Sequence, residues 1–561
     1  MDFSNWIVLL VAIPMGSTIL TTMLRGWTPA QRAVTVLSLL ASCIISIGGV
    51  LSLGDGQLLV SQAGDWPAPF GITIVFDQLS GILLSSSSFV ALAIYIYGLT
   101  SREQESGRGW FHPLYSLLMM GVNFSFLTGD LFNLFVAFEI MLMASYAMMC
   151  LGGTRQQLSQ CYKYVMINLV GSTFFVIGAA LIYGMTGTLN YADLALRVAQ
   201  STAPGGSPLP PGFSAVATML LFVFAVKAAL FPLWFWLPDT YHTCSISIAA
   251  VFSALLTKVG IYALVRLAPM ILAAPNIRQA GPIMTILPFA AGLTMLLGGL
   301  AALSMREVRR VLAMLLISHI GYMAFGLAIM TPVSLSGAVF YMMQHMVVMA
   351  ALFLSCGLIE RYQHTSDMAD TGGLFKRAPW LSALFFIAIV SLMGLPPFSG
   401  FFGKLLLLNE GFRLSSDGYW ILSVIGLFTS FFTILALAKV WIRTFWGAPQ
   451  KDIIAKTITN AAERLSLTPM YIGLTMLVLG SLTIGLGAEF FQKHTAAATY
   501  ELNEPRVYVA NVLGPGLWPD AANASADADS DAITKAKVSV GITNENALLI
   551  LPTSLVEGGL H

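Results

Sequence analysis

Long runs of apolar residues follow one another along most of this chain. A helix needs about 20 apolar residues to cross a bilayer core of about 30 Å. The stretches that approach or exceed this length are residues 6–24, 33–53, 77–99, 114–128, 130–152, 162–185, 213–237, 244–269, 281–304, 309–330, 334–359, 380–412, 419–445 and 468–487. No β-barrel alternation is seen in the sequence, so the pattern predicts an all-α polytopic membrane protein with about 14 transmembrane helices.

In two of these stretches helix-breaking residues lie close to a lysine, Lys227 or Lys404. Pro232 interrupts the seventh stretch, and Gly394-Leu-Pro-Pro397 interrupts the twelfth. Proline removes a backbone hydrogen bond, which a membrane helix tolerates where the freed carbonyl groups line a wet cavity. Paired interrupted helices in the two halves of a transporter indicate its ion path. We therefore expect helices 7 and 12 to be broken.

Ionisable residues recur at a nearly constant spacing in the two halves of the chain. The matching pairs are Lys227 and Lys404, 177 residues apart, Glu139 and His319, 180 apart, and Lys258 and Lys439, 181 apart. This spacing predicts that helices 4–8 and 9–13 are repeats. Because each unit has an odd number of helices, consecutive units must have inverted topology.

The pattern divides the chain into five regions. We expect an N-terminal three-helix region at 1–112, a first repeat at 113–270, a second repeat at 281–446, a loop with helix 14 at 447–490, and a flexible external tail at 491–561. The acidic, Ala-rich stretch Asp520–Asp531 is the main reason for the tail, because such a composition cannot build a core. A short amphipathic piece is expected at 189–198.

Composition and charge exclude several classes of function. Only 10% of the residues are charged and 57% are hydrophobic, whereas soluble domains carry about 25% charged residues. A net charge of +1 gives no reason to expect nucleic acid as a partner. The 5 cysteines are scattered, without metal spacing or a disulfide framework, and nucleotide and redox motifs are missing from the sequence. We therefore expect no cofactor, no metal and no enzymatic activity, but a secondary ion transporter driven by a gradient or a partner.

Basic residues predict the orientation. Counting from an outside N-terminus, the odd-to-even loops carry Arg25, Arg32, Arg102, Arg108, Arg155, Lys163, Arg306, Arg309, Arg310, Arg361, Lys376, Arg377, Arg443, Lys451, Lys456 and Arg464. The opposite loops hold little more than Arg197, Arg278 and Arg413. The positive-inside rule thus places both termini on the outer side.

The candidate functional residues are the ionisable ones in the middle of apolar stretches. Each costs about 2.5–3.5 kcal/mol on insertion scales and rarely persists without a partner or a water path. The candidates for a proton relay are Glu139, Lys227, Lys258, His319, His345 and Lys404. Glu139 and Lys227 are expected to form a switchable ion pair. A buried lysine favours its neutral form, and an approaching carboxylate restores the charge, so such a pair can take up and release a proton.

Structural interpretations compete with these roles. A neutral histidine can bond across helices, so His319 and His345 could simply hold helices together. Lys439, near the inner end of its helix, is expected to snorkel to the interface. Thr128, Asp130 and Asn133 cluster near one surface, where helix capping is the simpler interpretation than a cation site.

The run from Gly121 to Tyr146 (GVNFSFLTGDLFNLFVAFEIMLMASY) closely resembles the D-type subunit of the Mrp-type multisubunit Na⁺/H⁺ antiporters. The wider family includes the antiporter-like proton-pumping subunits of respiratory complex I. The resemblance covers about residues 1–490, including the Lys-Ala-Ala-Leu-Phe-Pro segment that begins at Lys227, Leu237-Pro-Asp239 and the segment from Gly394 to Lys404. His242 follows in a loop that departs from many relatives, and the tail lies outside the resemblance.

The resemblance implies roles for the candidate residues. Glu139 pairs with Lys227 in the broken seventh helix, Lys258 continues a hydrophilic axis, and Lys404 reaches the next subunit or an exit. His319 and His345 extend the axis between them. The fold implied is fourteen helices with two inverted five-helix repeats. The chain would lie in a bacterial inner (plasma) membrane within a complex that contains a large A-type antiporter subunit and small membrane subunits, and it would move protons and Na⁺.

Three functions remain open at this point. The first is the proton-conducting subunit of a Na⁺/H⁺ antiporter. The second is a proton-pumping membrane subunit of a complex I-like NADH:quinone oxidoreductase or a membrane-bound hydrogenase, in which nearly the same residues would be driven by a redox arm. The third is an inert scaffold whose charges only assemble helices. Whether the chain also carries Na⁺ is not indicated by any cage of oxygen ligands in the sequence.

Overall fold

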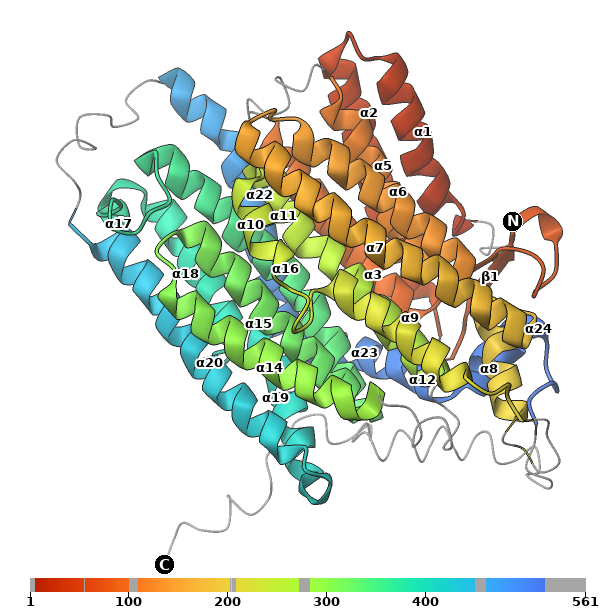
Figure 1. Ribbon diagram of the computed structural model, residues 1–561. Helices are drawn as coiled ribbons and strands as arrows, with labels where there is room; N and C mark the ends of the chain where they lie inside the picture. Colours follow the sequence, from red (N-terminus) through yellow and green to blue (C-terminus); the bar gives the residue numbers. More distant parts are fainter. Residues whose placement is uncertain are drawn as a thin grey trace, which may run out of the picture. The chain divides into compact units, whose positions relative to one another are not determined.

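The structure is a computed structural model that describes residues 6–519 except 55, 100–108, 202, 204–207, 272–282 and 449–460. The described chain is a bundle of helices, many of them running side by side along the molecule (Figure 1). The predicted all-α membrane architecture is confirmed. The acidic stretch at 520–531 that suggested a flexible tail lies outside the described residues.

The N-terminal region contains three long helices and one small sheet. The helices are α1 (Leu9–Met23), α2 (Thr28–Ser52) and α3 (Gln78–Gly98). Between α2 and α3 lies an antiparallel hairpin of β1 (Leu59–Gln62) and β2 (Thr73–Phe76), joined through the short helix η2 (Ala63–Asp65). This hairpin was not predicted from the sequence, because its four-residue strands lie in a stretch too short and too polar to stand out between apolar runs.

The first predicted repeat forms one group of helices. They are α5 (Phe111–Leu127), α6 (Leu131–Cys150), α7 (Arg155–Thr186), α8 (Tyr191–Gln200), α9 (Phe213–Ala228), α10 (Trp236–Thr243), α11 (Ile246–Val251), the π-helix η3 (Phe252–Leu256) and α12 (Thr257–Ile271). The amphipathic piece predicted near residue 190 corresponds to α8, whose side chains are largely buried.

The second predicted repeat and the C-terminal elements follow in the same manner. They are α14 (Ile283–Ser304), α15 (Val308–Ile329), α16 (Pro332–Gln363), α17 (Leu374–Arg377), α18 (Pro379–Met393), α19 (Ser399–Arg413), η4 (Ser415–Asp417), α20 (Trp420–Trp441), η5 (Ile442–Trp446), α22 (Ala461–Leu486), α23 (Ala488–Asn503) and α24 (Pro505–Leu513). Every one of the predicted apolar stretches contains helix. Within the described chain 10 helices are long and apolar enough to cross a membrane, so the full count of fourteen stays a prediction.

The two predicted helix breaks are confirmed. The seventh stretch is split into α9 and α10, and Ala229, directly after α9, has the left-handed conformation with φ +60°. The twelfth stretch is split into α18 and α19, and Gly394 at the break has φ +81°. In both places the chain turns out of the helix before proline and re-enters it afterwards, which leaves carbonyl groups at the end of the first half-helix without their usual helical partners.

The two halves also match in a feature that was not used in the prediction. Both α7 and α16 are 32 residues long, and both begin with a capping box, formed by Thr154 with Gln157 and by Thr331 with Ser334. In each half this long helix follows a tight helical hairpin, α5 with α6 and α14 with α15. The inverted relation between the two halves stays a prediction.

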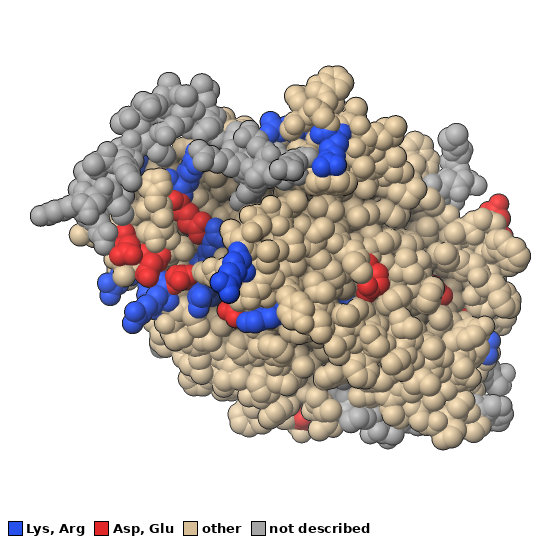
Figure 2. Space-filling model, turned by 45° about the horizontal axis from the view of Figure 1, so that its top comes forward, with Lys and Arg blue, Asp and Glu red and all other residues tan. Residues whose placement is uncertain are grey.

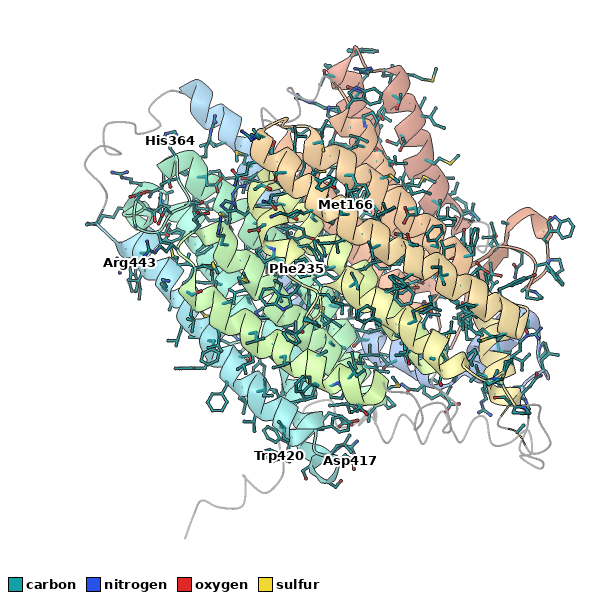
Figure 3. The ribbon with its side chains drawn as sticks, viewed as in Figure 1. Met166, Phe235, His364, Asp417, Trp420 and Arg443 are labelled. Carbon is teal, nitrogen blue, oxygen red and sulfur yellow. The ribbon has the colours of Figure 1, made fainter. Side chains whose placement is uncertain are left out.

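The centre of the bundle is formed by α12, α15 and α16, whose apolar stretches are wholly buried. By contrast α7 and α20 carry exposed apolar side chains, such as Met166 on α7, labelled in Figure 3. In the same view α20 runs from Trp420, beside Asp417, to the end of the molecule where Arg443 and His364 lie. Apolar side chains on outer helices are what a lipid environment requires, and Figure 2 shows a large uncharged surface with charged residues gathered mainly at one end.

The predicted boundary of a flexible tail at residue 491 is wrong for its first part. α23 and α24 are ordered helices that pack on the bundle, where α23 contacts α3 and α16. The Thr495 hydroxyl lies 3.0 Å from that of Ser336, and Tyr508 on α24 is buried. The reason is that residues 488–513, unlike the acidic stretch beyond them, carry enough apolar surface on one side to bury, although they are too polar to read as a span.

Candidate functional site

A hydroxyl group joins the two predicted charges of the first half. The Ser172 Oγ of α7 donates a short hydrogen bond to Glu139 Oε1 of α6, and Lys227 Nζ of α9 donates to the same Ser172 Oγ at 3.2 Å. Within the described residues no direct ion pair joins Glu139 to Lys227. The expected ion pair is therefore replaced, in this conformation, by two hydrogen bonds that link the ammonium to the hydroxyl and the hydroxyl to the carboxylate.

Lys227 reaches this position because it lies in the last turn of α9. Its side chain is 5% exposed, and the ammonium lies 4.9 Å from the centre of the Phe138 ring, a favourable cation–π distance. The break after Ala228 is fixed from the other half of the chain, since the Phe231 N–H donates to Thr294 Oγ1 of α14 at 2.9 Å. The helix break thus positions the charged residue that the sequence places beside it.

Close backbone packing connects Lys227 with the helix of Lys258. A Cβ atom at Gly260 on α12 would lie 2.7 Å from the Ala228 nitrogen and 3.0 Å from the Lys227 carbonyl carbon. Real Cβ contacts are essentially never that short, so only glycine allows α12 to approach the end of α9 at this point. The approach brings the backbone beside Lys227 against a residue two positions from Lys258.

Lys258 is held by the π-helix that precedes it. Its Nζ donates a short hydrogen bond to the Ser253 carbonyl oxygen in η3, and its side chain is wholly buried. A π-turn widens the helix and shifts the normal hydrogen-bond pattern, and such turns often occur at functional sites. Here it makes a backbone oxygen available to a buried ammonium group, and no carboxylate contacts Lys258 in the described part of the chain.

The structure brings His319 and His345 together with two tyrosines in the middle of the bundle. His319 Nδ1 shares a short hydrogen bond with the Tyr341 hydroxyl, and the rings of His319 and His345 lie 5.5 Å apart. Neither ring nitrogen of His345 forms a hydrogen bond to another described residue, and neither does His319 Nε2. Buried polar atoms are usually satisfied by protein or by ordered water. These three nitrogens are therefore available to water or to a passing proton.

Lys404 is held at the break between α18 and α19. Its Nζ donates to the carbonyl oxygens of Leu392 and Met393 at 3.2 and 3.0 Å, which are the last residues of α18 before the break. The ammonium also lies 5.2 Å from the centre of the Tyr322 ring. The Tyr322 ring in turn stacks on the His319 ring at 5.7 Å, so Lys404 and the two histidines form one cluster.

Three members of the site were not predicted from the sequence. Ser172 bridges the acid and the base, while Tyr341 and Tyr322 line the histidine cluster. A serine after glycine at 171–172 is a weak signal, because serine in an apolar helix commonly bonds its own backbone instead. The tyrosines carried no separate signal among the 17 of the chain.

Two secondary predictions can be compared with the structure. Asp130 Oδ1 accepts a hydrogen bond from the Asn133 N–H at 2.9 Å, and the Asn133 amide donates to Thr128 Oγ1 at 3.0 Å, so the cap interpretation of this cluster is confirmed. Burial raises the pKa of Asp130, which precedes the span of α6, against the opposing hydrogen bonds of the Asn133 and Phe132 N–H groups. Lys439 donates to the carbonyl oxygens of Leu303 and Met305 at 2.9 Å, so it holds the end of α14 rather than joining the central cluster.

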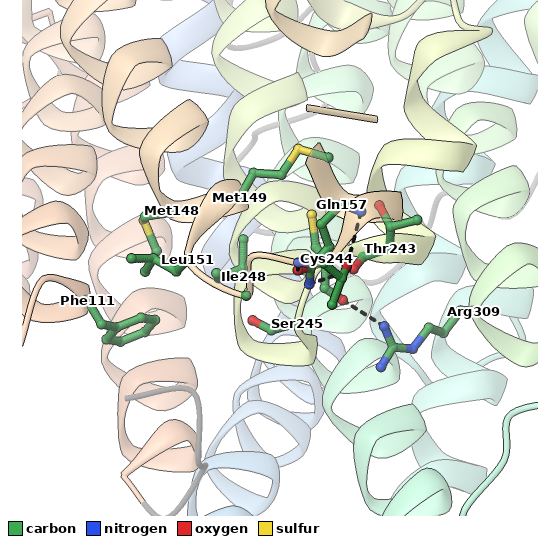
Figure 4. A pocket seen from close by; sticks show the side chains of 12 residues that line it. Phe111, Met148, Met149, Leu151, Gln157, Thr243, Cys244, Ser245, Ile248 and Arg309 are labelled. Carbon is green, nitrogen blue, oxygen red and sulfur yellow. Dashed lines mark hydrogen bonds between the residues drawn. The ribbon is translucent and has the colours of Figure 1, made fainter. Parts of the chain in front are cut away.

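Polar residues line two cavities at the end of the bundle where α10 ends and α15 begins. His242 forms a short hydrogen bond with Glu307, and Arg309 forms a bidentate pair with Glu360. The two pairs line an open cavity of 620 Å³. A second cavity of 360 Å³ lies between the α6–α7 turn and the α10–α11 turn, where Arg309 donates to the Cys244 carbonyl oxygen at 2.7 Å (Figure 4). His242, whose role could not be assigned from the sequence, thus lines a polar cavity at the end of the bundle that is predicted to face the cytoplasm.

Several known proteins are similar to this chain in sequence and in fold. The family described as NADH:quinone oxidoreductase/Mrp antiporter, transmembrane, matches residues 128–433. The D-type subunit of the Na⁺/H⁺ antiporter of Alkalihalophilus pseudofirmus is 36% identical over 510 residues, which cover 91% of this chain and 99% of that protein. A chain in the solved Mrp complex of a Dietzia species is similar with a TM-score of 0.80 and 29% identity, covering 92% of this chain and 100% of the other. A chain of an archaeal membrane-bound sulfane sulfur reductase also has a TM-score of 0.80, with 27% identity and coverage of 90% and 99%.

Proposed function

Because the chain belongs to the NADH:quinone oxidoreductase/Mrp antiporter family, we propose that it is a proton-conducting antiporter subunit of a multisubunit Na⁺/H⁺ antiporter. The observation that carries the proposal is the Ser172 hydroxyl, which joins a carboxylate and an ammonium group inside an apolar bundle. A hydroxyl between an acid and a base can accept one proton while it donates another. The arrangement therefore suits proton transfer better than static packing.

The proposed path continues from Lys227 to Lys404 through the centre of the bundle. In this path Lys258 follows Lys227 across the tight contact at Gly260, and His345 and His319, whose rings lie 5.5 Å apart, lead on to Lys404. An imidazole has two ring nitrogens and can take up a proton on one while it releases a proton from the other. The unpartnered ring nitrogens of this pair support water-assisted transfer at this step.

Coupling arises from the first pair. When the Glu139 carboxylate is linked to Lys227 through Ser172, the positive charge on the lysine is stabilised. When this link opens, the desolvated ammonium releases its proton more easily. Movement of charge in one half thereby biases the other half, as a ligand biases a two-state equilibrium.

The partners follow from the relatives. Since the relatives are D-type subunits and the similar structure is an Mrp complex, the chain works with other subunits of such a complex, which we propose include a large A-type antiporter subunit and small membrane subunits. We further propose that it is a transporter component and not an enzyme, that it lies in a bacterial plasma membrane, and that both termini face outward, as the basic loops predict.

A redox-driven proton pump is the second candidate. It is favoured by one observation, the equally high similarity to a chain of an archaeal respiratory membrane complex. The higher identity to a D-type antiporter subunit over nearly its whole length favours the antiporter. Purifying the complex and identifying its subunits separates the two, because a pump requires subunits with Fe–S or flavin groups.

The proposed function is tested by Glu139→Gln. The amide keeps the size and hydrogen bonding of the side chain but removes its charge, so exchange should be abolished while the complex still assembles. Na⁺-driven dequenching of a ΔpH probe in inverted vesicles measures exchange, normalised to assembled complex. Asp417→Asn, at the exposed last residue of η4, is the matched control. Near-normal exchange in Glu139→Gln would end the relay mechanism for this subunit.

A further inference from the structure

Two thiols lie against each other at one end of the α6–α7 hairpin. Cys150 is the last residue of α6 and Cys161 lies in the second turn of α7, and their sulfur atoms are 3.1 Å apart. Both cysteines are free thiols. The Cys161 thiol also lies 3.6 Å from the Tyr146 carbonyl oxygen of α6. In the sequence the cysteines look scattered, because this contact depends on the antiparallel packing of two helices.

We propose that Cys150 and Cys161 are a modification site, which forms a reversible intramolecular disulfide with small-molecule disulfides as the oxidant. Two thiols joined by a tight hairpin have a short loop to close, so the reaction needs only a small movement of the helix ends. Cys150 is partly exposed whereas Cys161 is 4% exposed, so the reaction begins at Cys150.

The reaction balances in two exchange steps. The Cys150 thiolate attacks one sulfur of a small disulfide, whose S–S bond breaks, and one small thiolate leaves. The Cys161 thiolate then attacks the Cys150 sulfur of this mixed disulfide and expels the second small thiolate. In sum the two protein thiols lose two protons and two electrons, and the small disulfide is reduced to two thiols.

The disulfide would act on the same helix pair that holds the proposed relay. Cys150 follows Glu139 by 11 residues on α6, and Ser172 follows Cys161 by 11 residues on α7. The thiol pair and the Glu139–Ser172 hydrogen bond are therefore two contacts between the same antiparallel helices, α6 and α7. They lie about 16 Å apart along the helix axes, at 1.5 Å per residue. A covalent bond between the two cysteines restrains the sliding and twisting of α6 against α7 that would break the Glu139–Ser172 hydrogen bond.

Aromatic side chains also connect the thiol pair with α10 and with the π-helix η3. The Tyr146 ring, beside the thiols, meets the Tyr164 ring edge-on at 5.2 Å, and Tyr164 packs on Trp236 of α10 at 5.3 Å. Tyr164 also stacks on Phe252 at 6.4 Å, in the π-helix that holds Lys258. A shift of α6 toward α7 at Cys150 therefore presses on elements of the proposed proton path.

The location fits a redox response. The hairpin turn precedes Arg155, which the charge pattern assigns to the cytoplasmic side. Thiols are kept reduced in that compartment, and disulfides formed there are mostly transient and regulatory. We infer that oxidation of this pair slows exchange and that reduction restores it. The effect on exchange rests on the proposed function, but formation of the disulfide does not.

The test uses the assembled complex in inverted vesicles, with dithiodipyridine as the small disulfide. Trypsin cleavage after Arg155 separates the two cysteines, so only a disulfide keeps the two peptides joined in an unreduced digest. We expect joined peptides in the wild type and a fall in exchange of about tenfold, which corresponds to a barrier about 1.4 kcal/mol higher for opening the restrained Glu139–Ser172 contact. Dithiothreitol should reverse both effects.

Cys150→Ser and Cys161→Ser should form no joined peptides and should keep their exchange after oxidation. Cys43→Ser is the matched control, since Cys43 is buried on α2 and its loss should leave the wild-type response unchanged. Oxidised wild type without joined peptides overturns the proposal, and so does inhibition that persists in Cys150→Ser. Because the disulfide is detected by mass, its absence refutes this inference alone, whereas a reduced wild type that fails to exchange refutes the proposed function.

Discussion

Ser172 offers the sharpest test of how the first half of the site works. Ser172→Ala removes the hydroxyl that accepts from Lys227 Nζ at 3.2 Å and donates to Glu139, but leaves both charged residues in place. A hydrogen bond to a charged group contributes about 1.5–3 kcal/mol. If the barrier to proton transfer rises by the loss of one such bond, exchange slows by about 10- to 150-fold, since about 1.4 kcal/mol corresponds to a factor of ten.

The assay is Na⁺-driven dequenching of a ΔpH probe in inverted vesicles, normalised to assembled complex. Ser172→Thr keeps the hydroxyl and should retain most of the exchange. Thr173→Ala is the matched control in the same turn of α7, because the exposed Thr173 hydroxyl donates to the Leu169 carbonyl oxygen of its own helix and, among the described residues, to no other group. Exchange in Ser172→Ala that equals that of Thr173→Ala would refute the bridging role.

Further predictions concern helix contacts and the second half. Gly260→Ala should impair exchange, because its Cβ would lie 2.7 Å from the Ala228 nitrogen and overpacking costs about 1–3 kcal/mol. Gly171→Ala should be tolerated in the same assay, because its Cβ would lie 4.0 Å from the Val226 side chain. Lys404→Arg should impair exchange, because a guanidinium cannot deprotonate, whereas Lys439→Arg should keep it. Equal activity of the two variants would argue against a relay at Lys404. Ending the chain after residue 518 should allow assembly by blue native electrophoresis, whereas ending it after residue 486, which removes α23 and α24, should not.

The class of fold and most of the central charges could be predicted from the sequence. Apolar stretches of membrane length are unambiguous, and a charge such as Lys258 or Glu139 in the middle of one is too costly to be incidental. Helix breaks at Pro232 and near Gly394 were also visible, because proline removes a backbone hydrogen bond, although α1 continues through Pro14 and α14 through Pro288. These features depend on single residues and their chemistry.

The remaining features depend on contacts between distant segments. Whether Ser172 bonds its own backbone or a neighbouring carboxylate is decided by the rotation of α7 against α6, which no local pattern records. The same applies to Cys150 and Cys161. The π-turn at η3 has no sequence signature, because it arises from how α11 and α12 pack on α16. Helices α23 and α24 were missed, since a hydropathy window long enough for a span averages out short amphipathic helices.

The anchoring of the central lysines on backbone oxygens has a consequence for how this protein can vary. Lys258 is bound to the carbonyl of Ser253, and Lys404 to those of Leu392 and Met393. Every amino acid brings a carbonyl group, so no point substitution at these three positions deletes the ligand of either lysine. The side chains at these positions are constrained only in volume and polarity. Insertion or deletion of one residue, however, would rotate the carbonyl oxygens away from the lysine ammonium groups. Random mutagenesis should accordingly find these positions permissive to exchange of side chains and intolerant of changes in length.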